Sequence, residues 1–287
     1  MVAIKLDGEQ VSLELKSALK QRISKLQEMS ITPGLGTILV GDDGPSKNYI
    51  AMKHRDCKEL GMHSEEINLP ASTTQEEIVE AIETFNTDPQ IHAFIIQYPF
   101  PRDLDYETAL LHVLPEKDAD GLHPVNLGKL VQGILAPLAC TPAGIQYLLE
   151  QYDVPIKGKH VVIVGRGLTI GRPLANLLSL KRSNANATVT VTHTGTEDIS
   201  IHTKQADILI AAAGSPHMIK ADMVKPGSAV VAAGVSFEGE KLLSDVADEV
   251  DQVAGWLSPR IGGVGPMTRA FLMANTVQAA EKTLGTF

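Results

Sequence analysis

The sequence has little of what marks a secreted, metal-binding or nucleic-acid-binding protein. Only two of its 287 residues are cysteines, Cys57 and Cys140, and neither has a CxxC partner, which argues against a disulfide framework or a zinc ribbon. The nine histidines are dispersed as well, so no metal site is predicted. Lysines and arginines are scattered and the formal net charge is −9, so nucleic acid is not an expected partner.

Long apolar runs are also missing. Stretches such as ADILIAAAG at 206–214 fall well short of the ~20 residues that cross a bilayer, so no membrane association is expected. The N-terminal stretch MVAIKLDGEQ turns polar too early for a signal peptide, which predicts a cytoplasmic protein. The remaining composition, 44% apolar and 21% charged, is that of a globular chain long enough for about two domains.

Hydrophobic periodicity predicts two successive α/β series. The first has helices at 9–29, 46–60, 74–86 and 105–113 and strands at 35–41 and 91–99. The second follows the breaker-rich stretch 135–144, with helices at 143–151 and 171–180, strands at 159–165, 187–193, 206–214 and 228–235, and a glycine loop before a last helix. Strands that alternate with helices predict parallel sheets covered by helices.

A glycine-rich turn lies between a strand and a helix of the second series. In VVIVGRGLTIGRP, residues 161–173, an apolar strand runs directly into Gly165, Gly167 and Gly171. Glycine allows the backbone to approach a pyrophosphate, and the helix N-terminus presents free amides to it. The GxGxxxG spacing is one residue longer than the common dinucleotide fingerprint, so a purely structural turn remains an alternative.

The following strand bears on the choice of dinucleotide. It ends in His193 and Thr194 and lacks the acidic residue that usually holds a free ribose 2′-hydroxyl. A histidine, hydroxyls and the nearby Arg166 are compatible with a 2′-phosphate, which favours NADP over NAD. The alternative is that Arg166 forms only a surface salt bridge.

Polar side chains also gather at the predicted strand ends of the first series. Tyr49 and Lys53 share a helical face at i and i+4, Gln97 ends a strand, and PEKDADGLHP supplies Asp118 and Asp120 in a turn. Strand ends of a parallel sheet converge on one edge, so these groups are expected to meet. The alternative for a YxxxK pair is an exposed lysine whose stem packs on the tyrosine.

Six segments, taken in order from about residue 38 to 277, are VGDDGPSKNYIAMK, IIQYPFP, KDADGLHP, CTPAG, VVIVGRGLTIGRP and GGVGPMTRAFLMANT. Together they resemble the methylenetetrahydrofolate dehydrogenase/cyclohydrolase family. The resemblance implies an α/β fold with two parallel-sheet domains. These are a catalytic domain at 1–142 that is completed by a C-terminal helix at 269–287, and a Rossmann-like NADP-binding domain at 143–268. It also implies a homodimer that acts on tetrahydrofolate derivatives.

The resemblance assigns roles to particular residues of this chain. The catalytic lysine falls on Lys53, its supporting tyrosine on Tyr49, the glutamine on Gln97 and the pterin-binding aspartate on Asp120, and these four also bind the substrate. Further substrate-binding residues are Gly262, Gly263, Pro266 and Thr268, in the glycine loop. The cofactor-binding residues are Gly165, Arg166, Gly167, Ile170, Gly171, His193 and Thr194.

Three departures from the family pattern affect the cofactor side. Gly167 stands where the family has a serine, Ala232 and Ala233 replace the usual Asp-Val before glycine, and Ile261 replaces a proline. These changes bear on cofactor affinity and loop shape, and none removes a residue of the predicted catalytic cluster.

The implied reactions are NADP-dependent oxidation of 5,10-methylenetetrahydrofolate and hydrolysis of the methenyl product to 10-formyltetrahydrofolate. The hydrolysis moves protons, and Lys53 acts as its base if burial and a cationic ligand lower its pKa from the ordinary value of about 10.4. Two alternatives remain: a dehydrogenase without the hydrolytic activity, and a catalytically silent dinucleotide-binding protein of the same fold.

Overall fold

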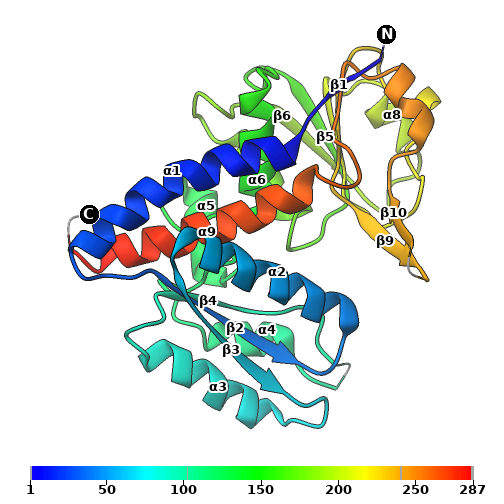
Figure 1. Ribbon diagram of the computed structural model, residues 1–287. Coiled ribbons are helices and arrows are strands. Elements are labelled where there is room, and N and C mark those ends of the chain that lie inside the picture. Colours follow the sequence, from blue (N-terminus) through cyan, green and yellow to red (C-terminus); the bar gives the residue numbers. More distant parts are fainter. Residues whose placement is uncertain (1, 102, 240, 286–287) are drawn as a thin grey trace. The chain divides into compact units, whose positions relative to one another are not determined.

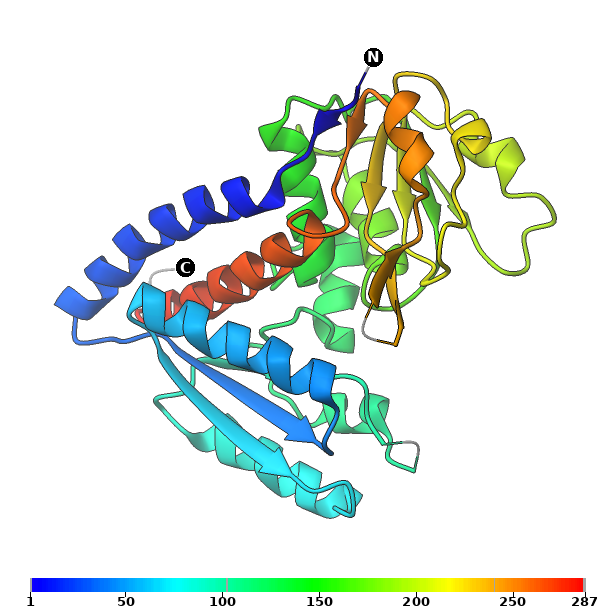
Figure 2. The same cartoon turned by 45° about the vertical axis from the view of Figure 1, so that its right-hand side comes forward.

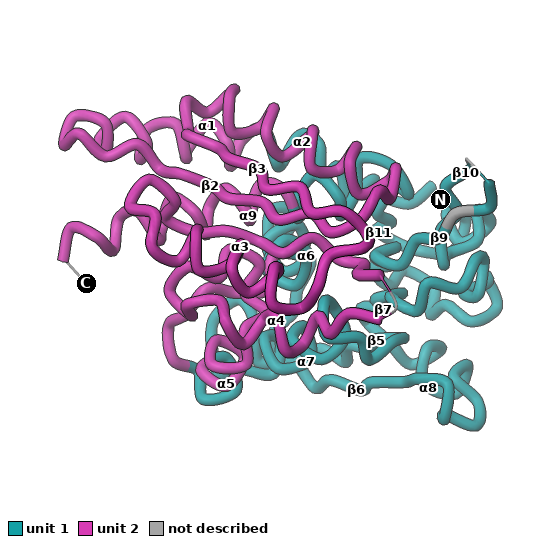
Figure 3. Tube along the Cα trace, turned by 90° about the horizontal axis from the view of Figure 1, so that it is seen from below, with its two compact units in different colours: residues 1–13, 130–133, 141–268 teal, residues 14–129, 134–140, 269–287 magenta. Residues whose placement is uncertain are grey.

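The computed structural model describes residues 2–101, 103–239 and 241–285 (Figure 1). Its chain divides into two compact units, shown in Figure 3. Unit 1 comprises residues 1–13, 130–133 and 141–268, and unit 2 comprises 14–129, 134–140 and 269–287. The helix expected to complete the catalytic domain, 269–287, lies in unit 2, but its last two positions are outside the described residues.

Unit 2 is built on a parallel sheet of three strands in the order β3-β2-β4. The strands are β2 (Gly34–Val40), β3 (His63–Leu69) and β4 (Ala93–Ile96). Helices α2 (Gly44–Leu60) and α3 (Gln75–Thr87) cover opposite faces of this sheet (Figure 2). The other helices of the unit are α4 (Tyr106–Leu111), most of α5 (Pro124–Gln132), and the larger parts of α1 (Gly8–Glu28) and α9 (Val264–Lys282).

Side-chain alternation along the strands divides the core of unit 2 into two clusters. In β4, Ala93 and Ile95 pack with residues of α1, α2 and α9, whereas Phe94 and Ile96 pack with α3. Because successive side chains of a strand point to opposite faces, Gln97 continues the series of Ala93 and Ile95. The sequence pattern of β4 therefore directs Gln97 toward the face that α2 covers.

Unit 1 contains a six-stranded parallel sheet in the order β1-β11-β8-β7-β5-β6. Its strands are β1 (Ile4–Lys5), β5 (His160–Val164), β6 (Thr188–Thr192), β7 (Ile208–Ala211), β8 (Ala229–Ala232) and β11 (Trp256–Leu257). An antiparallel hairpin, β9 (Val235–Glu238) and β10 (Lys241–Ser244), follows β8. The helices are most of α6 (Cys140–Gln151), α7 (Gly171–Ser179) and α8 (Ser200–Thr203), with 3₁₀ turns at Ala221–Met223 and Asp248–Gln252.

The strand order of unit 1 reverses beside β5. The chain passes from β5 to β6 on one side and then returns to β7 on the other, so the loops that follow β5 and β7 are neighbours. Such a switch point, at the carboxyl ends of parallel strands, is where open α/β sheets bind ligands. The predicted glycine loop follows β5 and so lies at this point.

Several predicted boundaries were wrong. Helix α2 begins at Gly44 and is capped by Asp43, whose carboxylate accepts the Ser46 amide, so Ser46 is not its first residue. Helix α9 begins at Val264, which places Pro266 and Thr268 in a helix and leaves only Gly262 and Gly263 in the loop. Proline is tolerated there because the amides of a first helical turn have no partner inside the helix.

Candidate functional site

The predicted catalytic side chains of unit 2 come from α2, from the end of β4 and from the turn at Asp120. The Lys53 amine lies 4.6 Å from the centroid of the Tyr49 ring, and it donates a hydrogen bond of 2.9 Å to Oε1 of Gln97. The Gln97 amide is fixed, because its Nε2 donates to the Tyr98 carbonyl at 2.6 Å. Lys53 is only 5% exposed, which rules out the reading of a solvated lysine on the surface.

The turn that carries Asp120 is held by its neighbour Asp118. Residues 117–119 lie beside β4, where Phe94 exchanges backbone hydrogen bonds with Lys117 and Ala119. The buried Asp118 carboxylate accepts the amides of Gly121, Leu122 and His123 and the side-chain amide of Asn126. Asp118 therefore shapes the turn, and Asp120 is the carboxylate left to face the lysine.

The electrostatics of the cluster favour neutral groups. Burial lowers the pKa of Lys53, and the positive charge of Arg269 acts in the same direction, whereas Asp120 and Cys140 oppose both. Burial likewise raises the pKa of Asp120, against the opposing effect of Lys53. Burial also raises the pKa of the Tyr49 phenol well above 10. The structure thus holds an amine that gives up its proton more readily than a lysine in water, as the sequence analysis expected.

Sequence reasoning missed Cys140 and Asn275 as supports of this cluster. The Cys140 thiol lies against the Asp120 carboxyl and the Ala119 carbonyl, and both cysteines of the chain are free and buried. Asn275, on α9, donates to the carbonyls of Ala119 and Leu138, both at 2.9 Å. Asn275 is 156 positions from Ala119, so no spacing in the sequence could have linked them, and Cys140 is 21 positions from Ala119, beyond any helix or strand repeat.

The predicted cofactor residues are all in unit 1, in the loop after β5 and at the end of β6. Gly165 has a φ of +124°, and a Cβ there would overlap the carbonyl oxygen of Ala212, after β7. A Cβ at Gly171 would overlap the carbonyl of Gly165, whereas one at Gly167 meets open space. Gly165 and Gly171 are therefore required by backbone packing, and Gly167 leaves room above the loop.

The helix after this loop begins without a side-chain cap. Ile170 is in the capping position of α7 and has no polar side chain, so the first-turn amides have no side-chain acceptor from it. The Arg172 amide donates to the Gly167 carbonyl at 3.1 Å and Pro173 has no N–H, so among the first three residues of α7 it is Gly171 whose amide can meet the pyrophosphate of a dinucleotide. Together with the space at Gly167, this arrangement fits NADP as the cofactor.

The end of β6 carries the remaining predicted cofactor residues. His193 is partly buried, and its Nδ1 accepts the Gly195 amide at 3.0 Å, which fixes the ring. Thr194 and Arg166 are exposed. Residues 193–196 contain no carboxylate, so this end of the strand has no anion that would repel a 2′-phosphate.

Asp245 supports the same region and was not predicted. It is fully buried, and its Oδ2 accepts the amides of Ala213 and Gly214 at 2.7 and 2.9 Å. These amides belong to the loop after β7, which packs against Gly165. In the first turns of α9, Thr268 shares a hydrogen bond of 3.0 Å with Thr141, a pair that sequence spacing did not indicate.

Comparison with known proteins agrees with this geometry. A family model for the catalytic domain of tetrahydrofolate dehydrogenase/cyclohydrolase matches residues 6–120, and one for its NAD(P)-binding domain matches residues 139–284. The chain belongs to this family. It is 52% identical over 282 residues to the bifunctional protein FolD of Syntrophotalea carbinolica, covering 98% of this chain and 97% of that one.

Solved structures give the same result. The bifunctional FolD enzyme of Campylobacter jejuni is 38% identical, with a TM-score of 0.94 over 98% of this chain and 99% of that chain. The FolD enzyme of Trypanosoma brucei, solved with NADP and an inhibitor, is 32% identical, with a TM-score of 0.93 over 99% of both chains. The predicted fold class, two parallel-sheet units of which one is Rossmann-like, is confirmed.

Proposed function

We propose that this chain oxidises 5,10-methylenetetrahydrofolate with NADP and hydrolyses the resulting 5,10-methenyltetrahydrofolate to 10-formyltetrahydrofolate. Membership of the bifunctional family supports both reactions. The observation that carries the hydrolytic half is the buried Lys53 amine, with Gln97 at 2.9 Å and the Tyr49 ring at 4.6 Å. A dehydrogenase without hydrolytic activity would have no use for an amine whose pKa is lowered by burial.

The oxidation depends mainly on positioning. NADP, when bound, accepts the hydride at its nicotinamide ring. The charge left on the folate is shared by two nitrogens, so no protein acid or base is obligatory in this step. The cofactor is held by the predicted residues of the loop after β5 and the end of β6, which are Gly165, Arg166, Gly167, Ile170, Gly171, His193 and Thr194.

Hydrolysis of the methenyl cation requires a base for the attacking water. Neutral Lys53 takes a proton from the water as its oxygen bonds to the methenyl carbon; the bond from that carbon to N5 then breaks, N5 gains a proton, and one proton leaves to solvent. Gln97 and Tyr49 orient the amine, and Asp120 binds the pterin ring. The approaching cation disfavours the ammonium form of Lys53 further, because like charges repel. Gly262, Gly263, Pro266 and Thr268 complete the substrate-binding set.

Each of the two α/β series of the chain binds one of the two ligands. Residues 1–142, with the C-terminal helix from 269, form the folate-binding catalytic domain, and residues 143–268 bind NADP. The family resemblance further supports a homodimer in the cytoplasm. Among the described residues, no helix has the length and apolarity that a membrane span requires.

Two assays on the purified chain test this function. With methylenetetrahydrofolate and NADP, reduced cofactor is expected to accumulate, and NAD is expected to serve less well. With methenyltetrahydrofolate alone, hydrolysis is expected to exceed the uncatalysed rate. Reduction of NADP without hydrolysis of methenyltetrahydrofolate would indicate a monofunctional dehydrogenase. The absence of both activities would indicate a catalytically silent dinucleotide-binding protein.

A further inference from the structure

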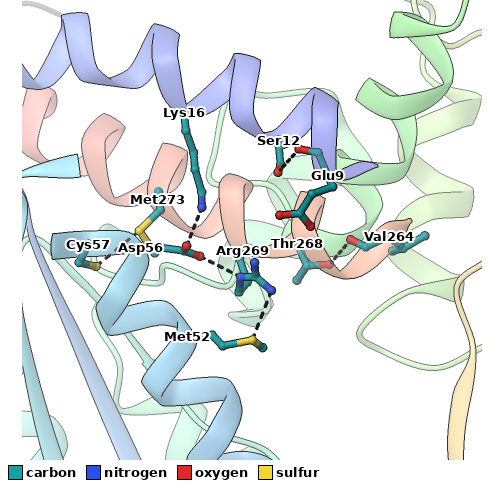
Figure 4. Close-up of polar contacts among 10 residues, drawn as sticks. All are labelled: Glu9, Ser12, Lys16, Met52, Asp56, Cys57, Val264, Thr268, Arg269 and Met273. Atoms are coloured by element: carbon teal, nitrogen blue, oxygen red, sulfur yellow. Dashed lines mark hydrogen bonds and ion pairs between the residues drawn. The ribbon is translucent and has the colours of Figure 1, made fainter. Parts of the chain in front are cut away.

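A buried cluster of three charged side chains joins α1, α2 and α9 in unit 2 (Figure 4). Asp56, on α2, accepts from the Lys16 amine at 2.5 Å through Oδ1 and from Nε of Arg269 at 2.8 Å through Oδ2. The Asp56 side chain is 4% exposed, Lys16 11% and Arg269 12%. We call these three residues the Asp56 cluster.

The Asp56 cluster is not neutral. It contains two cations and one anion, so a buried excess of one positive charge remains. Removing charges from water is costly, and apolar residues would join three helices at least as stably. A purely structural role accounts for one donor to each Asp56 oxygen, but it does not require that both donors carry a charge.

The position of Arg269 gives a reason for its charge. Tyr49, Met52, Lys53 and Asp56 follow one another at i, i+3, i+4 and i+7, so they share one face of α2. Arg269 contacts this face at two points, because its Nε binds Asp56 and its Nη1 lies 3.7 Å from the Met52 sulfur. Its guanidinium is thereby fixed along the same face as the Lys53 amine.

We propose that Arg269 is a positioning residue for the hydrolysis, held by Asp56 and Lys16 so that its fixed positive charge keeps the Lys53 amine in the neutral, basic form. The proposal rests on the proposed function, in which Lys53 is the base. It assigns to the Asp56 cluster an electrostatic role in addition to its role in joining the helices.

Other charged and titratable groups surround Lys53, and their signs matter. Asp120 and Cys140 favour the ammonium form, whereas burial and Arg269 favour the amine. His54, the next residue on α2, has a pKa lowered chiefly by burial, so it adds little positive charge near neutral pH. Arg269 is thus the permanent cation that acts with burial against the larger effect of Asp120. The charges that act on the amine are those of Asp120, Cys140 and Arg269, the Tyr49 ring lies 4.6 Å from it, and Lys53 in turn lowers the pKa of His54.

The test is the pH dependence of methenyltetrahydrofolate hydrolysis, with the uncatalysed rate subtracted. A neutral base gives a rate that rises with pH to a plateau, and the midpoint reports its pKa. Arg269→Met removes the adjacent cation, so the midpoint is expected to rise by about one pH unit while the plateau changes less than about twofold. Below the midpoint, hydrolysis is then about tenfold slower than in the wild type.

Lys16→Met is the matched control. It removes the same charge from the Asp56 cluster, but Lys16 contacts Asp56 on the side away from Arg269 and is not among the charges that act on Lys53. Its midpoint is expected to move by less than about 0.3 pH unit. Arg269→Lys keeps the charge and loses the planar fork, and it is expected to restore the wild-type midpoint more closely than Arg269→Met.

Asp56→Asn changes the charge of the Asp56 cluster in the opposite direction to Arg269→Met. It leaves two cations without their anion, so the midpoint is expected to fall below the wild-type value. If this variant does not fold, Lys16→Met combined with Asp56→Asn retains one positive charge, and its midpoint is expected at or below that of the wild type. Loosened packing alone would lower the plateau in all variants and would not move the midpoint in opposite directions.

The possible outcomes separate the inference from the proposed function. Equal midpoints in the wild type, Arg269→Met and Lys16→Met would overturn the inference, as would equal upward shifts in the two variants. If Lys53→Met hydrolyses the substrate at the wild-type rate, the role of Lys53 itself fails. A midpoint that rises in Arg269→Met and stays in Lys16→Met supports the inference.

Discussion

The two units use their residues in opposite ways. In unit 2 the site consists of ionisable side chains from separate elements, and its lysine is 5% exposed. In unit 1 the corresponding region consists of main chain, with Gly165 and Gly171 packed against carbonyl oxygens and Arg166 and Gly167 exposed. Proton transfer needs a side chain with a shifted pKa, whereas holding a pyrophosphate needs only amides in the right places.

This contrast teaches which changes each unit can tolerate. On the proposed function, a substitution in the Lys53 cluster of unit 2 is expected to act on the reaction through charge, even where the backbone is undisturbed. A substitution in unit 1 acts through backbone space, so its effect depends on whether a Cβ has room. The predictions below test this difference, beginning with the largest effect.

Lys53→Met is expected to have the largest effect. Loss of the base should slow hydrolysis by about 10²- to 10⁴-fold, the usual range for general acid–base catalysis, while NADP affinity is unchanged. Initial rates with methenyltetrahydrofolate measure the loss. Lys47→Met, which removes an exposed lysine from the same helix, is the matched control and should keep the wild-type rate.

Gly165→Ala and Gly167→Ala form the matched pair for unit 1. A Cβ at Gly165 overlaps the Ala212 carbonyl and the φ there is +124°, so NADP binding is expected to weaken by at least about tenfold. A Cβ at Gly167 meets no atom of this chain, and the serine that the family has at this position also carries a Cβ, so the variant should stay within about threefold of the wild type. Equal losses in NADP titrations of the two variants would contradict the backbone account.

Asp120→Ala is expected to weaken folate binding by roughly tenfold, about the contribution of one hydrogen bond to a charged group. NADP affinity should remain as it is, because Asp120 belongs to unit 2. Separate titrations with each ligand measure the two affinities. A parallel loss of both would indicate misfolding and not the removal of a substrate contact.

The smallest predicted effect concerns stability. Because the folded state lowers the pKa of Lys53, the unfolded chain binds this proton more tightly, so folding is disfavoured at pH values below the unfolded pKa of about 10.4, and most strongly below the folded pKa. Lys53→Met should therefore unfold at a higher denaturant concentration at neutral pH, by a free energy on the order of 1 kcal/mol. The difference in the free energy of unfolding between Lys53→Met and the wild type should become smaller as the pH rises toward about 10.4. A difference in the free energy of unfolding that does not change with pH would argue against a lowered pKa of Lys53.

Much of the site was predictable because its signals are local. Tyr49 and Lys53 are one helical turn apart, and Gln97 follows a strand whose alternation fixes its direction. The glycine loop was predictable for the same reason, since strand, turn and helix are contiguous. Local spacing therefore indicated the residues that the structure brings together around Lys53.

The rest could not be found in this way, for physical reasons. Asp56 and Arg269 are 213 positions apart, and neither residue type marks a buried pair. The strand β3 was missed because it is an edge strand whose residues Glu65 and Glu66 face solvent, so it lacks an apolar run. The start of α9 was missed because glycine and proline in a first helical turn look like a loop.

The central claim is that the folded chain holds the Lys53 amine in its neutral form. The most direct measurement is a pH titration of the Lys53 side-chain nitrogen by ¹⁵N NMR in the folded protein, with Lys53→Met to assign the signal. The account predicts that the signal titrates well below the other lysines and moves to higher pH in Arg269→Met. A Lys53 signal that titrates together with the surface lysines, near pH 10.4, would contradict the account.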